Sequence, residues 1–319
     1  MDIFFQSFVP GVFAILRIFI IAITAGLLVR FKFVSDEHIN GLSKVTILVF
    51  LPCLIFSKIT NVFNPGEMEF WWVLPLLGMA FLLVGIGTGR ILFWKDFNQK
   101  RHLVAMAGMQ NAAYLVLPVG EALFPEQFDT FTVYVFLIVL GVSPVMWTLG
   151  KVLTTGQFTD GGFNWKQLIT PPFVANILAI SMVLLNLHTH VPEFIASPID
   201  MLGQAAVPVV TFVLGATLGG ISLRIWPHWL DILRVMLVKF IWMPLLVLIL
   251  LLIFNVYQDE QLLAELLIIQ ASSAPATSII LMSRTYGGNV QETGTTMLFS
   301  YFVCLLTIPI WISVLRMVV

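Results

Sequence analysis

The feature that most constrains this chain is a series of apolar stretches, each long enough to cross a lipid bilayer. A spanning helix takes about 20 residues. Residues 245–254 are apolar at every position, which is typical of a spanning helix and not of the alternating pattern of a membrane barrel strand. Charged residues make up 10% of the chain and hydrophobic residues 59%. A soluble surface needs about 25–35% charged residues, so the protein must lie in lipid.

The same numbers exclude other classes of protein. The net charge is −1, and no stripe of Lys and Arg is present to neutralise phosphates, so no nucleic-acid partner is expected. An enzyme is disfavoured because the chain has no HExxH or GxSxG motif. His188 and His190 alone are too few ligands for a metal site. No cofactor and no metal are predicted, and the lipid bilayer is the expected surrounding.

Ten membrane spans account for nearly the whole length of 319 residues. We predict an all-α polytopic membrane protein with short connections. The predicted spans are residues 8–30, 41–60, 70–93, 102–124, 130–152, 171–188, 199–222, 228–255, 261–286 and 294–317.

Basic residues fall on one side of this arrangement. Twelve Lys and Arg residues lie in or beside the connections that follow odd-numbered spans, and two, Lys58 and Arg316, lie on the other side. The twelve are Arg30, Lys32, Lys44, Arg90, Lys95, Lys100, Arg101, Lys151, Lys166, Arg224, Arg234 and Arg284. Cytoplasmic loops carry the excess of Lys and Arg. We therefore expect both termini outside a cell's inner, or plasma, membrane.

The two halves of the chain resemble each other in where their prolines fall. Each of the ten spans has a proline, and the two members of each corresponding pair lie about half a chain length apart. Because each half has five spans, the second half would enter the membrane from the opposite face. We predict two inverted five-helix repeats, residues 1–152 and 171–319, an architecture of secondary transporters.

Spans 4 and 9 are interrupted by proline together with polar residues. Proline removes a helical hydrogen bond and clashes with the preceding turn. Irregular backbone survives in a membrane only against protein or a water-filled cavity. We therefore predict that both spans are broken and form a substrate site at their breaks. The candidate residues are Gln110, Asn111, Tyr114 and Pro118 in span 4, and Gln270, Ser272, Ser273, Pro275 and Thr277 in span 9.

The broken spans predict the chemistry of the solute. Half-helices after the breaks present free N–H groups and positive dipole ends, which favour a carboxylate or similar anion. Half-helices before the breaks present carbonyl groups, which suit a cation or a polar substrate edge. The alternative is a proline kink that neighbouring Ser and Thr satisfy, with no ligand; two matched spans favour it less than one span alone.

Two charged residues inside spans are further candidates. Lys239 lies near the middle of span 8, where a charge is expensive and functional by default; snorkelling to the interface is the alternative. Glu121, three residues after Pro118, is either hydrated or a coupling carboxylate. For Glu265, at the start of span 9, we expect hydration.

The order and spacing of several motifs resemble the auxin efflux carrier family, which includes plant carriers and bacterial permeases. The resemblance covers nearly the whole chain. It rests on Asn111 with Pro118, on Gln270-Ala271-Ser-Ser-Ala-Pro275, and on further matches at Gly26-Leu27-Leu28, Leu42-Ser43-Lys44, Phe50-Leu51-Pro52-Cys53-Leu54, Tyr286 and Leu306-Thr-Ile-Pro309.

This resemblance implies a bile-acid-symporter-like fold in which helices 4 and 9 are broken and cross. It implies a scaffold of spans 1, 2, 6 and 7 and a transport domain of spans 3, 4, 5, 8, 9 and 10. It also implies a homodimer, elevator-type alternating access and a small organic anion as the transported solute. Plant members have a serine where this chain has Ile55, and charged residues in span 3 where residues 70–89 have none. An auxin-like solute is therefore disfavoured against a carboxylate or dicarboxylate.

Other functions stay open as alternatives. A sodium-coupled symporter of bile-acid type would use the oxygens of the same polar residues, but the crossing has no acidic residue to strengthen a cation site. A passive channel or sensor would favour a continuous polar lining and rings of charge. Two broken helices favour a carrier that binds a discrete solute.

Overall fold

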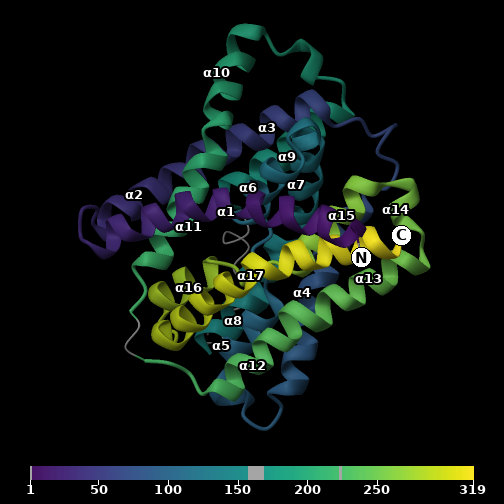
Figure 1. The fold of residues 1–319 in the computed structure, drawn as a ribbon. Coiled ribbons are helices and arrows are strands. Elements are labelled where there is room, and N and C mark those ends of the chain that lie inside the picture. The colour runs from purple at the N-terminus through teal and green to yellow at the C-terminus, as the bar shows by residue number, and fades with distance from the viewer. Residues whose placement is uncertain (1, 157–168, 223–224) are drawn as a thin grey trace.

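The computed structural model describes residues 2–156, 169–222 and 225–319 as a bundle of helices (Figure 1). No strand occurs in these ranges. The α-helices are α1 Asp2–Arg30, α2 Asp36–Val45, α3 Leu51–Val62, α4 Val73–Leu92, α5 Phe97–Gly108, α6 Val116–Leu123, α7 Phe128–Val145, α8 Lys151–Thr155, α9 Pro171–Leu184, α10 Glu193–Gln204, α11 Ala206–Gly219, α12 Trp229–Met236, α13 Met243–Ile253, α14 Val256–Asp259, α15 Gln261–Ala271, α16 Ser278–Tyr286 and α17 Val290–Val318.

Seven helical stretches in the described residues are long and apolar enough to cross a membrane. They are Phe4–Arg30, Asp36–Val62, Val73–Leu92, Pro125–Thr155, Glu193–Gly219, Trp229–Ile253 and Val290–Val318. Shorter apolar helices occupy Pro171–Leu184 and Gln261–Ala271. The protein is thus an all-helical polytopic membrane protein, and each predicted span coincides with helical structure. The count of ten spans, the inverted repeat and the two-domain division stay predictions. Lys166 and Arg224, used for orientation, lie outside the described residues.

Several prolines lie within helices here without breaking them. α1 continues through Pro10 and α17 through Pro309. π-helical turns at Thr46–Phe50 and Leu237–Trp242 precede Pro52 and Pro244. A π-turn absorbs one extra residue and relieves the clash that proline makes with the preceding turn. Phe240, four residues before Pro244, has its carbonyl paired instead with the Trp311 indole N–H at 2.8 Å.

The helix pair α1 and α11 approaches closely, and glycine makes that approach possible. A Cβ atom on Gly215 would lie 2.0 Å from the Ala22 carbonyl oxygen, and one on Gly219 would lie 2.3 Å from that of Gly26. α1 also packs along α17, as the purple and yellow ribbons show in Figure 1. α3 packs on α9 and α10, and α4 packs on α5 and α7. α1 therefore packs between α11 and α17.

Candidate functional site

Two helices are interrupted where the sequence predicts breaks. The first interruption separates α5, which ends at Gly108, from α6, which begins at Val116. The second separates α15, which ends at Ala271, from α16, which begins at Ser278. We call the non-helical segments 109–115 and 272–277 the crossing segments, because they lie against each other.

The crossing segments pair through their backbones. Asn111 N–H donates to the Ala274 carbonyl at 2.8 Å, and Ala276 N–H donates to the Met109 carbonyl at 3.0 Å. These two bonds form a single antiparallel bridge between Gln110 and Pro275. Backbone groups freed by a broken helix must find partners inside the protein when water is absent. Each break thus supplies partners for the other.

Two amide side chains reinforce this pairing. The Asn111 amide donates to the Tyr301 hydroxyl at 2.6 Å, and that hydroxyl donates to the Pro275 carbonyl at 3.2 Å. The Gln270 amide donates to the Ala112 carbonyl at 3.0 Å. Each amide therefore reaches from one side of the crossing to the other, directly or through Tyr301 of α17.

Two polar atoms at the crossing have no partner among the described residues. They are Nε2 of Gln110, a donor, and Oε1 of Gln270, an acceptor. Gln110 is 3% exposed and Gln270 is 0% exposed. Leaving such an atom unpaired costs about 1–3 kcal/mol, and native proteins pair nearly all of them. A solute or a water molecule at the crossing would supply the missing bonds.

The other predicted site residues are placed as follows. Ser272 and Ser273 are buried, but their hydroxyls donate back to the carbonyls of Ile268 and Gln270 in their own chain segment. Tyr114 and Thr277 are half-buried, and each lies at or near the C-terminal end of its crossing segment.

Pro118 departs from the expected geometry. It lies in the first turn of α6, after the break and not within it. The first-turn position tolerates proline because its missing N–H would have no helical partner there. Pro275, in contrast, lies inside its crossing segment.

A cavity of about 290 Å³ adjoins the crossing. It lies between α1, α11 and α17 and reaches the crossing at Leu115 and Tyr301. Its walls are mostly apolar, with Ile18, Phe19 and Leu214 among them. Arg30 also lines the cavity and donates to the Ile221 carbonyl at 3.3 Å. An organic anion with an apolar body would find both kinds of surface here.

Lys239 is 2% exposed, so the snorkelling alternative is wrong. Within the described residues it has no carboxylate partner and no hydrogen bond. Its amino group lies near the thiol of Cys304. Cys304 in turn donates to the Ser272 carbonyl at 3.5 Å. Cys304 therefore lies between Lys239 and the crossing. Glu121, by contrast, is exposed at the end of α6.

The expectation that Glu265 is hydrated is wrong. Glu265 is 1% exposed and accepts two bonds from Arg316, from Nε to Oε1 at 2.7 Å and from Nη2 to Oε2 at 2.8 Å. Buried carboxylates are retained when paired in this two-pronged way. The sequence offered no signal because the two residues lie 51 positions apart.

Sequence reasoning also missed Tyr301, Cys304 and Arg30. Tyr301 is 1% exposed and joins the crossing through two hydrogen bonds. A tyrosine in the middle of a span is a signal that could have found it, since a buried hydroxyl needs a partner. No group of three or more His, Cys, Asp or Glu side chains in the described ranges is placed to hold a metal ion.

Comparison with known proteins gives a consistent result. The sequence profile described as membrane transport protein matches residues 10–159 and 158–312. An uncharacterized transporter from Methanocaldococcus jannaschii is 23% identical over 288 residues, which cover 88% of this chain and 91% of the relative. A second uncharacterized transporter, from Methanothermobacter thermautotrophicus, is 25% identical over 224 residues, which cover 66% and 68% of the two chains.

Proposed function

The chain belongs to the membrane transport protein family, the family of the auxin efflux carriers, and is a transporter and not an enzyme; on that premise we propose that it is a secondary carrier of small organic anions. The crossing supports this proposal, because its two broken helices share backbone hydrogen bonds and leave Gln110 Nε2 and Gln270 Oε1 without partners among the described residues. A bound carboxylate would accept from Gln110 Nε2, and a hydroxyl group of the solute or a water molecule would donate to Gln270 Oε1.

The charges near the crossing favour an anion as the solute. No Asp or Glu occurs in residues 109–115 or 272–277. Arg30 lines the adjoining cavity. A carboxylate in such surroundings gains from nearby positive charge, whereas a cation would be repelled. We propose a carboxylate or dicarboxylate as the solute class.

The proposed mechanism is elevator-type alternating access. α1, α2 with α3, α9, and α10 with α11 would form the scaffold, and the remaining spans would carry the crossing. The cavity supports this division because it lies between α1 and α11 on one side and α17 and Leu115 on the other. In this proposal two copies form a homodimer through scaffold spans in the plasma membrane, and both termini lie outside.

Reconstituted vesicles provide the test of the function. The purified protein would be offered radiolabelled malonate, malate, benzoate and indole-3-acetate, each with and without a sodium gradient. A carrier gives saturable uptake and accelerated exchange when the same acid is preloaded inside. Uptake that never saturates and shows no exchange would contradict the carrier and favour a channel. Failure of every acid to be transported would contradict the anion proposal.

A further inference from the structure

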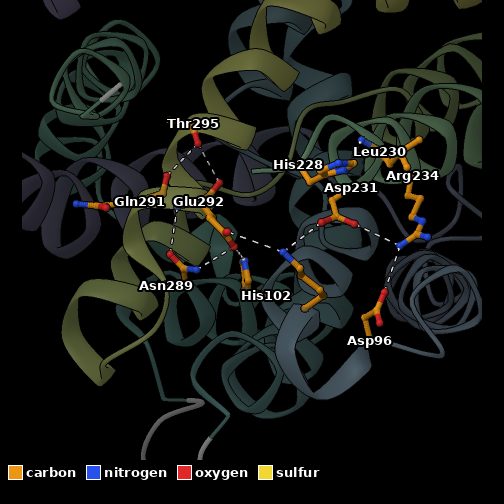
Figure 2. A network of polar contacts seen from close by, with 11 residues as sticks. Asp96, His102, His228, Leu230, Asp231, Arg234, Asn289, Gln291, Glu292 and Thr295 are labelled. Carbon is orange, nitrogen blue, oxygen red and sulfur yellow. Dashed lines mark hydrogen bonds and ion pairs between the residues drawn. The ribbon is translucent and has the colours of Figure 1, made fainter. Parts of the chain in front are cut away.

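A cluster of charged side chains joins α5, α12 and α17, away from the crossing (Figure 2). Figure 2 shows Glu292 of α17 turned toward His102 of α5, with Asp231 and Arg234 of α12 farther along the same network. His102 Nε2 lies 3.0 Å from Glu292 Oε2, and the Asn289 amide donates to that same oxygen at 2.9 Å. We call the ionic residues Asp96, Lys100, His102, Asp231, Arg234 and Glu292 the three-helix cluster.

Within the three-helix cluster, His102 is the nearest partner of Glu292 that can carry a positive charge. Lys100 Nζ lies 3.1 Å from Asp231 but 3.8 Å from Glu292. Arg234 also forms ion pairs with Asp231, at 3.3 Å, and with Asp96, at 3.8 Å. Three carboxylates thus share two permanent cations. A second ring proton on His102 would bring the cluster to neutrality.

Burial makes this balance matter, because His102 is 5% exposed and Asp231 6%. An unpaired charge removed from water is strongly unfavourable. Glu292, Lys100 and Asp231 are the charged groups that act on His102.

Charged groups on the other elements around α5 engage different partners. Arg90 of α4 lies over the Phe97 ring, Lys151 of α8 over the Tyr286 ring, and Lys239 near Cys304. Arg101 of α5 itself donates to the Gly156 carbonyl at 3.4 Å. The charge on His102 is therefore set inside the three-helix cluster.

A polar stripe on α17 connects this cluster with the crossing. Glu292, Thr296, Ser300 and Cys304 follow at intervals of four residues, which places them on one face of the helix. The last three are fully buried. The Thr296 hydroxyl has no partner among the described residues, and Cys304 contacts the Ser272 carbonyl of the crossing. The Ser300 hydroxyl donates to the Thr296 carbonyl at 2.7 Å, so the stripe forms a line of buried polar atoms from the cluster to the crossing.

We propose that His102 and Glu292 form a proton-binding site that couples proton movement to transport through the stripe on α17. This inference rests on the proposed carrier function and names its coupling ion. Neutral His102 has one ring nitrogen without hydrogen, and that nitrogen accepts a proton from water. The resulting imidazolium pairs with the Glu292 carboxylate. Loss of the proton returns it to water and leaves Glu292 without its close cation.

Histidine NMR tests the proton site without any solute. The chain has five histidines. A variant with His38, His188 and His190 all changed to Gln leaves two histidines. His228 is kept because it caps α12, which carries Asp231, and comparison with His102→Gln identifies the His102 signal. We expect that signal to titrate within the range in which histidine changes charge. Glu292→Gln should lower its midpoint by about one pH unit, because an opposite charge is removed.

The exposed residue Glu126 supplies the matched control, since Glu126→Gln should leave the midpoint unchanged. A His102 signal that does not titrate in this range would overturn the proposal. So would a midpoint that Glu292→Gln leaves where it was. A purely structural ion cluster, with His102 fixed in one charge state, would give the first of these results.

Vesicles that contain a pH-sensitive dye test the coupling. With malonate as the probe, the parent protein should change the internal pH during uptake, and His102→Gln should reduce that change by about tenfold or more. Malonate uptake without a pH change would overturn the coupling while the carrier function stands. If malonate and the other three acids are not transported, the proposed function fails, and the NMR result still decides the proton site.

Discussion

Gln270 shows how one side chain serves both the fold and the proposed site. Its amide nitrogen holds the Ala112 carbonyl across the crossing, and its oxygen is left without a partner among the described residues. Asn111 does the corresponding work from the other segment through Tyr301. Because an amide both donates and accepts, Gln270 can order the backbone with its nitrogen and offer its oxygen to a hydroxyl group of a solute or to water.

Leucine at either amide should therefore abolish transport while the protein still inserts. Gln270→Leu leaves the buried Ala112 carbonyl without its donor, at a cost of about 1–3 kcal/mol. Asn111→Leu removes the donor to the Tyr301 hydroxyl, which keeps its own bond to the Pro275 carbonyl. We expect uptake of the transported acid to fall by about tenfold or more in vesicles. Thr24→Ala is the control, because the Thr24 hydroxyl is exposed and bonds only to Ile20 of its own helix. If both leucine variants take up the acid like the parent protein, the crossing is only a structural kink and does not bind the solute.

The Glu265–Arg316 pair predicts a change in stability. Glu265→Gln keeps the shape but removes the charge that Arg316 grips with two nitrogens. Breaking a buried pair costs about 3–5 kcal/mol. We expect less, about 1–3 kcal/mol, because the Arg316 side chain is 32% exposed and partly hydrated. The measurement is the melting temperature in detergent, where Glu126→Gln at an exposed site should change nothing.

At the scale of elements, helices of this protein are shaped by how each proline is accommodated. Pro52 and Pro244 follow π-turns, and Pro10 and Pro309 lie within continuous helices. Only at the crossing, within the described residues, does the chain leave helical geometry for a whole segment and pair with another such segment. Proline alone therefore does not mark a break; proline with mutual backbone partners does.

The contact between α1 and α11 gives the prediction at this scale. Gly215→Ala would place a methyl group 2.0 Å from the Ala22 carbonyl oxygen, so the two helices must move apart. We expect a clear fall in melting temperature and a loss of transport, since the same helices wall the cavity. Gly87→Ala is the matched control. A Cβ there meets no atom within 4 Å, so alanine should stabilise the helix slightly. Equal melting temperatures for the two variants would contradict this reading of the contact.

At the scale of the whole molecule, the uneven distribution of Lys and Arg predicts the orientation in the membrane. A reporter active only in the cytoplasm should give no signal when fused after Val319. The same reporter inserted after Gly156, in the central connection, should give a signal. Positive charges are retained on the cytoplasmic side during insertion. Activity at Val319 would show that the number of spans is odd or that the orientation is reversed.

The oligomeric state is the second prediction for the whole molecule. We expect a homodimer, which the resemblance to the auxin efflux carriers implies. Light scattering of the purified protein, after subtraction of bound detergent, should give about twice the chain mass of 35.7 kDa. Retention of that mass on dilution would distinguish a stable dimer from chance association. A mass equal to one chain would remove the dimer from the proposed mechanism.

The sequence by itself determined that this chain is a helical membrane protein with two interrupted spans. Those properties are local. Apolar runs longer than a bilayer core exclude a soluble fold, and proline beside Asn, Gln and Ser predicts a break within a few residues of where it occurs. The family also follows from short motifs in order, and the comparisons confirm it.

Only the tertiary structure decided which polar groups meet. Asn111 pairs with Tyr301 across 190 positions, and Gln270 with Ala112 across 158. The burial of Lys239, the Arg316 partner of Glu265 and the grouping of His102 with Glu292 depend on helices far apart in the chain. A buried polar atom must find a partner wherever packing supplies one. Sequence spacing shows that such an atom exists, but packing decides what it binds.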